Sequence, residues 1–159
     1  MPTTWLIPSW APNFHPLVIH FPIVLVMAAA VVDLVDVAFE RSAWLKSATT
    51  TLYITSALSL IVTFLTGLQA QGTVLIPGMA YPVLGEHRQW AFITMTYCIV
   101  VAALRLVVLR GDGARSKKRR LTLLGIGLVS VVLVQQTAER GARLVYEYGT
   151  GIIGAPAPR

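Results

Sequence analysis

The chain has 159 residues, of which 55% are apolar and only 13% are charged, and its formal net charge is +6. An average soluble domain carries about 25% charged residues, so these values exclude an ordinary soluble fold, and the length fits one domain. The positive charge is unevenly placed: six of the 13 Lys and Arg residues fall in one short segment, without a basic helix face or an RNA-binding motif. It therefore indicates membrane topology and no nucleic-acid binding. Cys98 is the only cysteine, which excludes an intrachain disulfide and a cysteine-rich metal site.

Residues 1–14 hold Trp5 and Trp10 among three prolines and contain no Lys or Arg. Proline interrupts regular structure, and tryptophan favours the lipid headgroup level. We expect an irregular segment on the membrane surface, with a disordered tail as the other interpretation. The positive region of a cleavable signal peptide is missing, so the first helix is expected to act as an uncleaved membrane signal.

The first predicted helix covers residues 16–39 and opens with the sequence His-Pro-Leu-Val-Ile-His-Phe-Pro at 15–22. Pro16 suits a first helical turn, where its missing N–H costs nothing. Pro22 lies inside the helix and is expected to kink it and to free a carbonyl near Val18. The apolar run exceeds the roughly 20 residues that a bilayer core requires.

Three further apolar helices are predicted, over residues 48–69, 86–109 and 121–148. The helix at 48–69 is rich in Ser and Thr, which favour close packing between membrane helices. Gly and Pro interrupt residues 71–85, and we expect this nearly uncharged segment to fold back over the bundle end. The chain is therefore predicted to be all-α, a single domain over residues 1–159 that forms a bundle of four transmembrane helices.

The basic residues predict the orientation. Six Lys and Arg residues fall in 110–120 and two in 40–47, whereas the N-terminal tail and residues 71–85 have none. By the positive-inside rule, loops 40–47 and 110–120 are cytoplasmic and both termini lie on the periplasmic side of a bacterial inner membrane. The segment Arg110–Arg120 is expected to contact anionic lipid headgroups, with docking on an acidic soluble partner as the alternative.

This topology places all three histidines, His15, His20 and His87, in one layer near the outer surface. His15 and His20 lie about 140° apart around a helix, so they do not form the one-face pair of a zinc site. One of them and His87 are placed to bind a flat cofactor from opposite faces, as in bis-histidine haem of b type. His20 is the preferred ligand because it lies inside the helix, whereas His15 is expected to cap the helix or bond a loop carbonyl.

Three arginines are predicted at the same end, and Arg88, Arg140 and Arg143 are candidates to pair with haem propionates. The competing interpretation is structural, with the histidines bonding backbone carbonyls that Pro16 and Pro22 free. A small metal ion, a quinone or a proton path are further alternatives.

Charged residues also occur deep in two predicted helices. Asp33, Asp36 and Arg105 share a depth near the other boundary of the membrane. An unpaired charge there is costly, so Arg105 is expected to pair with Asp33 or Asp36. The alternative is that Arg105 extends to the headgroups while the aspartates reach water.

Three motifs resemble a widespread bacterial family of small four-helix membrane domains, domain of unknown function 2231. They are HPLVIHFPI at 15–23, Glu86-His87, and the segment 141–151 that begins Gly-Ala-Arg-Leu-Val-Tyr. The resemblance implies a four-helix membrane domain without a settled activity. Some members look fused to c-type cytochrome domains, which implies an electron-transfer setting.

The third motif departs from the family pattern. Ala142 replaces a glycine, and Tyr148 stands where members often have a histidine. A site that uses only His20 and His87 does not depend on that histidine.

Two functions are predicted. The first is a small electron-transfer component that holds haem b between the first and third helices, and the second is a non-catalytic accessory subunit of a larger respiratory or photosynthetic complex. In both cases other membrane subunits of a redox complex are the expected partners. No nucleophile elbow, phosphate loop or HExxH motif is present, so no catalytic activity of its own is expected.

Overall fold

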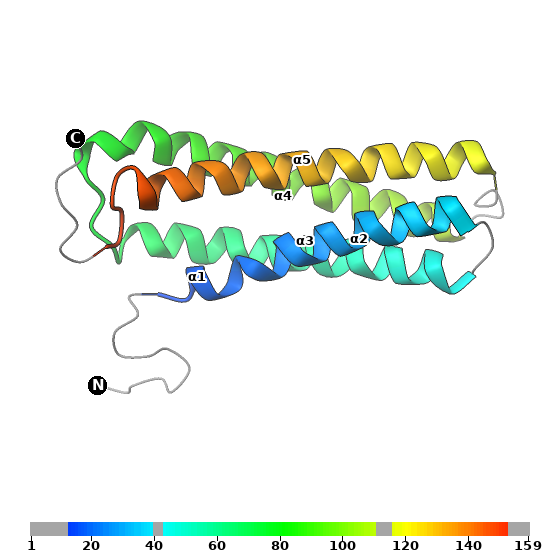
Figure 1. Ribbon diagram of the computed structural model, residues 1–159. Helices are drawn as coiled ribbons and strands as arrows, with labels where there is room; N and C mark the ends of the chain where they lie inside the picture. Colours follow the sequence, from blue (N-terminus) through cyan, green and yellow to red (C-terminus); the bar gives the residue numbers. More distant parts are fainter. Residues whose placement is uncertain (1–12, 40–42, 111–115, 153–159) are drawn as a thin grey trace, which may run out of the picture.

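The computed structural model describes residues 13–39, 43–110 and 116–152. Four long helices lie side by side and alternate in direction, which confirms the all-α four-helix prediction (Figure 1). A short helix precedes the first of them, and one 3₁₀ turn precedes the third. The elements are α1 (His15–Val18), α2 (His20–Phe39), α3 (Ala43–Gln71), η1 (Gly78–Ala80), α4 (Tyr81–Arg110) and α5 (Lys117–Tyr146).

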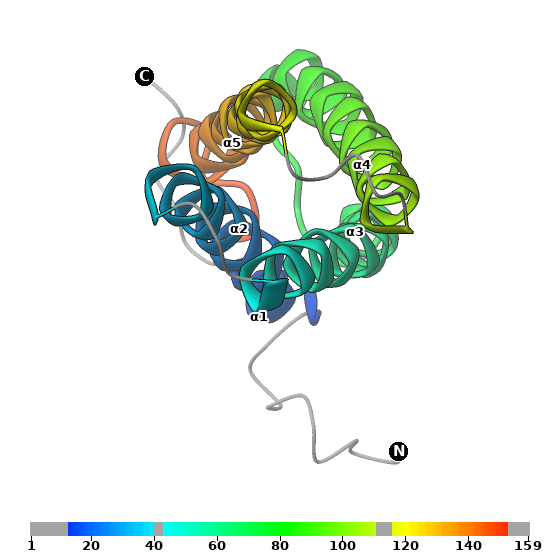
Figure 2. The same cartoon turned by 90° about the vertical axis from the view of Figure 1, so that its right-hand side faces the viewer.

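Seen along its axis, the bundle is a four-sided ring (Figure 2). Helix α2 packs against α3 and α5, and α4 packs against the same two helices. Helices α2 and α4 are therefore diagonally opposed and run in the same direction. We call the end that holds the three histidines the histidine end, and the opposite end, where α5 begins with residues 117–120, the basic end.

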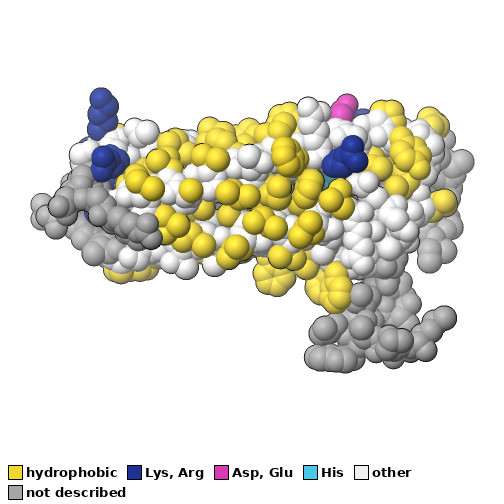
Figure 3. Space-filling view, turned by 180° about the vertical axis from the view of Figure 1, so that it is seen from behind, with side chains coloured by type: hydrophobic (Ala, Val, Ile, Leu, Met, Phe, Trp, Pro, Cys, Tyr) yellow, Lys and Arg dark blue, Asp and Glu magenta, His cyan; other side chains and the backbone are white. Residues whose placement is uncertain are grey.

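All four long helices are long and apolar enough to cross a membrane. Their interior is narrow and is formed largely by small or medium side chains such as Val26, Ala29 and Cys98. Large apolar side chains such as Phe21, Leu65 and Val107 point outward. Figure 3 shows this as an apolar band along one face, with basic side chains toward its ends. The chain is therefore a multi-pass membrane protein, because only lipid would cover so much outward apolar surface.

The helix boundaries differ from the predicted ones. Helix α3 begins at Ala43 and α4 at Tyr81, each five residues earlier than predicted. Pro82 lies in the first turn of α4, where a missing N–H costs nothing, so the prediction of a loop through residue 85 was wrong. Helix α5 begins at Lys117 because the Ser116 hydroxyl oxygen accepts a hydrogen bond from the Arg119 N–H at 3.2 Å.

The first membrane span is interrupted at Ile19, between α1 and α2. Pro22 has no N–H to donate to the carbonyl four residues before it. A break one turn ahead of Pro22 is the expected consequence.

The connection between α3 and η1 folds back over the histidine end, as predicted. The Asn13 side-chain amide donates a hydrogen bond to the Thr73 hydroxyl at 3.0 Å. The Gly151 N–H donates to the Leu75 carbonyl at 3.2 Å. Gly151 has a φ of 76°, a conformation that favours glycine. Both ends of the described chain are thereby tied to this connection.

Candidate functional site

The phase of α2 decides which histidine faces the bundle interior. Pro22, Ala29 and Asp36 are all buried, at intervals of seven residues. His15 lies seven residues before Pro22, in α1, and the intervening Ile19 keeps α-helical backbone angles (φ −60°, ψ −27°). His15 therefore shares this face, because seven residues make about two turns. His20 lies two residues before Pro22 and is exposed on the opposite face. The structure thus reverses the expected preference for His20 over His15.

The ring of His15 is held by α3. Its Nδ1 atom lies 3.2 Å from the Thr66 hydroxyl oxygen. That hydroxyl already donates its hydrogen to the Thr63 carbonyl at 3.0 Å, so it accepts from His15. Nδ1 therefore carries the ring hydrogen, and Nε2 keeps a lone pair. Gly67 lies against the same ring, since a Cβ atom at this position would come within 3.1 Å of His15 Cε1.

The ring of His87 is held by α5 in a similar way. Its Nδ1 atom lies 3.0 Å from the Thr137 carbonyl oxygen. A carbonyl only accepts hydrogen bonds, so Nδ1 again carries the hydrogen and Nε2 again keeps its lone pair. A Cβ atom at Gly141 would come within 3.0 Å of His87 Cε1. The glycine therefore provides the space in which the ring lies.

These two rings come from diagonally opposed spans and lie at the same end of the bundle. Histidines that bind metals typically donate their other ring N–H to a carbonyl or a similar acceptor, and both rings do so. In residues 13–39, 43–110 and 116–152 no three His, Cys, Asp or Glu side chains are grouped to hold a metal ion.

Arg140 is the only one of the three candidate arginines that lies beside the histidines. Its guanidinium stacks over the Trp90 ring at 4.6 Å from the ring centroid. Its Nε atom lies 3.5 Å from a carboxylate oxygen of Glu86, the residue before His87. Its Nη1 atom donates to the Gln136 carbonyl at 2.7 Å. These contacts keep a largely buried positive charge next to His87.

Arg88 and Arg143 do not join this cluster. Arg88 is exposed and lies on the outside of the bundle beside Phe64 and Phe92. Arg143 donates to the Glu147 carboxylate at 2.7 Å, and this hydrogen bond holds the pKa of Glu147 below its usual value. The structure therefore brings together His15, His87 and Arg140, but not His20, Arg88 or Arg143.

A second polar cluster lies deep in the basic half of the bundle, where Arg105 is paired with Asp33. The guanidinium donates from Nη1 to Asp33 Oδ1 at 2.8 Å and from Nη2 to Asp33 Oδ2. Nη2 also donates to the Leu123 carbonyl at 2.9 Å. Tyr53 donates its hydroxyl to Asp33 at 3.2 Å, and its ring lies 4.2 Å beneath the guanidinium. Arg105 is buried, so it does not extend to the headgroups.

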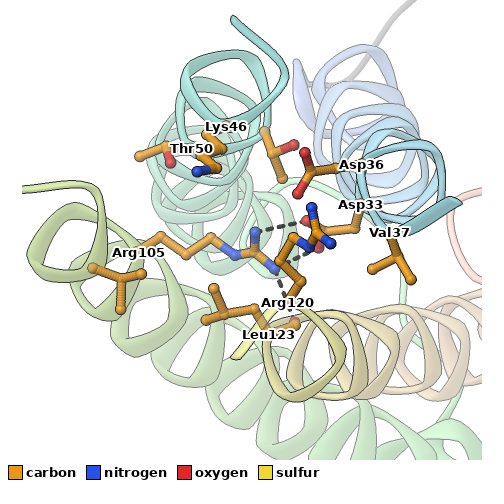
Figure 4. Close-up of a pocket in the computed structure, with 10 residues that line it drawn as sticks. Asp33, Asp36, Val37, Lys46, Thr50, Arg105, Arg120 and Leu123 are labelled. Carbon is orange, nitrogen blue, oxygen red and sulfur yellow. Dashed lines mark hydrogen bonds and ion pairs between the residues drawn. The ribbon is translucent and has the colours of Figure 1, made fainter. Parts of the chain in front are cut away.

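Asp36 lies one turn beyond Asp33 and is also buried, but its Oδ1 atom has no hydrogen-bond partner in the described part of the chain. It lines a cavity of about 40 Å³ at the basic end (Figure 4). The same cavity is lined by Asp33, Lys46, Arg105 and Arg120.

Gly127 is a site residue that sequence reasoning missed. The Tyr53 hydroxyl occupies the place where a Cβ atom at 127 would lie, and Asp33 Oδ2 would be 3.0 Å from that atom. A glycine in the middle of an apolar helix is the available signal, because small residues mark close approach in membrane bundles.

The comparison with protein families identifies this architecture. The chain matches a family described as a predicted membrane protein, DUF2231, over residues 11–154. It belongs to the DUF2231 family. Neither the curated proteins nor the solved structures contain a match. In this DUF2231 protein the residues that open the three resembling motifs, namely His15, the pair Glu86-His87 and Gly141, lie at the same end of the bundle. Tyr148 packs at that end against a cluster that contains Ala80 and Leu144.

Proposed function

We propose that this DUF2231 protein is a small membrane electron-transfer component, and that His15 and His87 would hold a b-type haem at the histidine end. The supporting observation is that both rings turn into the bundle from opposed helices and have their Nδ1 hydrogens engaged. Each ring therefore has an available lone pair on Nε2, the atom that would bind haem iron.

The surrounding residues have clear roles in this proposal. Thr66 and the Thr137 carbonyl fix the ring orientations. Arg140 is placed to pair with a propionate. The haem, when bound, would supply one-electron exchange. The hydroxyl of Thr63 is buried without a partner in the described chain and is a further polar group at this end.

The proposal includes a location. The chain would lie in the inner membrane of a bacterium with the basic end in the cytoplasm, because Lys and Arg concentrate there. The histidine end would then face the periplasm, and the basic segment would contact anionic headgroups. Electrons would pass between the haem and other membrane subunits of a redox complex.

An optical spectrum tests this proposal. Purified protein in detergent is expected to show the reduced-minus-oxidised bands of a b-type haem, and His15→Ala and His87→Ala are each expected to lose them. His20→Ala is the matched control, because His20 lies five residues from His15 but is exposed. It is expected to keep the bands at wild-type intensity.

A well-folded wild-type protein without these bands would reject the haem proposal. The histidines would then serve to join the helices, and the accessory subunit of a larger complex would become the leading function. Copurification of other subunits under mild detergent would test that alternative.

A further inference from the structure

The two halves of the chain share a spacing of polar residues and a pattern of burial. His15 and His87 are separated by 72 residues, and so are Asp33 and Arg105. From 15 to 27 and from 87 to 99, the sequence of buried, half-buried and exposed residues is the same at every position. Helix α1–α2 and helix α4 therefore present the same face to the bundle in the same register.

The partner helices α3 and α5 correspond with a separation of 74 residues. This separation relates Gly67 to Gly141 and Thr63 to Thr137. It also relates two serines, Ser56 and Ser130, that are both fully buried. The two separations, 72 and 74 residues, differ because the connections between helices differ in length. Insertions are easily accommodated in such connections.

The corresponding residues also make corresponding contacts. His15 packs on Gly67, and its Nδ1 atom lies 3.2 Å from a threonine oxygen, the hydroxyl of Thr66. His87 packs on Gly141 and bonds the Thr137 carbonyl. Heptad spacing alone explains why two diagonal helices share an inward face. It does not explain why the same residue types meet the same partners.

We propose that the bundle consists of two copies of one helical hairpin related by an axis along the bundle, and that the histidine site is formed by two equivalent half-sites. Each half-site contains one histidine, one glycine and one threonine oxygen, which is the Thr66 hydroxyl in the first half and the Thr137 carbonyl in the second. Parallel repeats about an axis along the membrane normal occur in other membrane proteins, with ligands at the repeat interface. The ligand would lie on the axis and meet an equivalent nitrogen from each side. That it is haem rests on the proposed function.

The equivalence makes Gly67 and Gly141 the positioning residues of the site. A Cβ atom at Gly67 would lie 3.1 Å from His15 Cε1, and one at Gly141 would lie 3.0 Å from His87 Cε1. Both distances are shorter than ordinary van der Waals contacts. The ring must then turn, which changes the direction of its Nε2 lone pair. The effect is local to one half-site, because the three atoms nearest to the added methyl group all belong to the ring of the adjacent histidine.

Nitrogen NMR of the histidine rings tests this inference without any ligand. The chain has only three histidines, so haem-free, ¹⁵N-histidine-labelled protein in detergent gives a simple spectrum at mildly alkaline pH. His15 and His87 are expected to show the same tautomer, with Nδ1 protonated. Gly67→Ala is expected to shift only the ring signals of His15, and Gly141→Ala only those of His87, by comparable amounts. Gly125→Ala is the control, since a Cβ atom there meets nothing within 4 Å.

Different tautomers for His15 and His87 in the wild-type protein would overturn the inference, even if a variant does not fold. A shift from only one of the two glycine variants would overturn it as well. The result is separable from the haem proposal. Equivalent ring signals in a protein that never shows haem bands would support the half-sites and reject the haem, and haem bands with unlike tautomers would do the reverse.

Discussion

Asp33→Ala is expected to lower the free energy of unfolding by about 3–5 kcal/mol, the usual cost of breaking a buried ion pair from one side. The variant leaves the Arg105 guanidinium buried with its two carboxylate acceptors removed. It also removes the acceptor of the Tyr53 hydroxyl. Chemical unfolding in detergent micelles, followed by circular dichroism, measures the loss.

Two controls separate charge from packing. Asp36→Asn changes a second buried carboxylate one turn away whose Oδ1 has no hydrogen-bond partner, and it is expected to have a much smaller effect. The double variant Asp33→Leu/Arg105→Leu removes both charges and is expected to regain most of the lost stability, because apolar replacement of a whole buried pair is often neutral. Equal unfolding midpoints for Asp33→Ala and Asp36→Asn would contradict the role assigned to the pair.

Gly127→Ala is expected to destabilise the bundle by about 1–3 kcal/mol, the range for overpacking a filled core. The added methyl group would occupy the position of the Tyr53 hydroxyl. Tyr53 would have to move, which would weaken its hydrogen bond to Asp33 and its contact with Arg105. The same unfolding measurement reports the change.

Gly125→Ala is the matched control, on the same helix two residues away and with open space at its Cβ position. It is expected to be neutral or slightly stabilising, because alanine favours helix over glycine. In a Tyr53→Phe background the cost of Gly127→Ala is expected to fall, since the clashing oxygen is absent. An undiminished cost in that background would show that the hydroxyl is not the obstacle.

The number and composition of the helices could be predicted from the sequence. An apolar run long enough to cross a bilayer must satisfy its backbone hydrogen bonds internally, and the α-helix does this within one segment. Their ends were predicted less well. Pro82 and Gly85 suggested a loop, yet both lie in the first turns of α4, where neither costs much. The ion pair at Arg105 was predicted because an isolated charge at that depth is costly, but depth alone did not distinguish Asp33 from Asp36.

The histidine site was predicted only in part. That His15, His20 and His87 would lie at the same end of the bundle followed from topology, but the choice of His20 depended on depth and ignored helical phase. The seven-residue spacing from His15 through Pro22 and Ala29 indicates that His15 shares the buried face of α2. The repeat was harder to see, because the two halves share a pattern of burial and few identical residues. The contacts of Gly67 and Gly141 with the histidine rings could not be predicted, because each glycine lies on a different helix from its histidine.

The pairing of Asp33 with Arg105 also bears on how the chain assembles. The two residues lie in different hairpins, and the hairpin of α1–α3 is synthesised first. Until α4 arrives, that hairpin holds an aspartate at membrane depth without its guanidinium, which is costly in lipid. Two copies of either hairpin would place like charges together. The first hairpin is therefore fully stabilised only when the second hairpin of the same chain packs against it. The ion pair also disfavours the association of two identical hairpins.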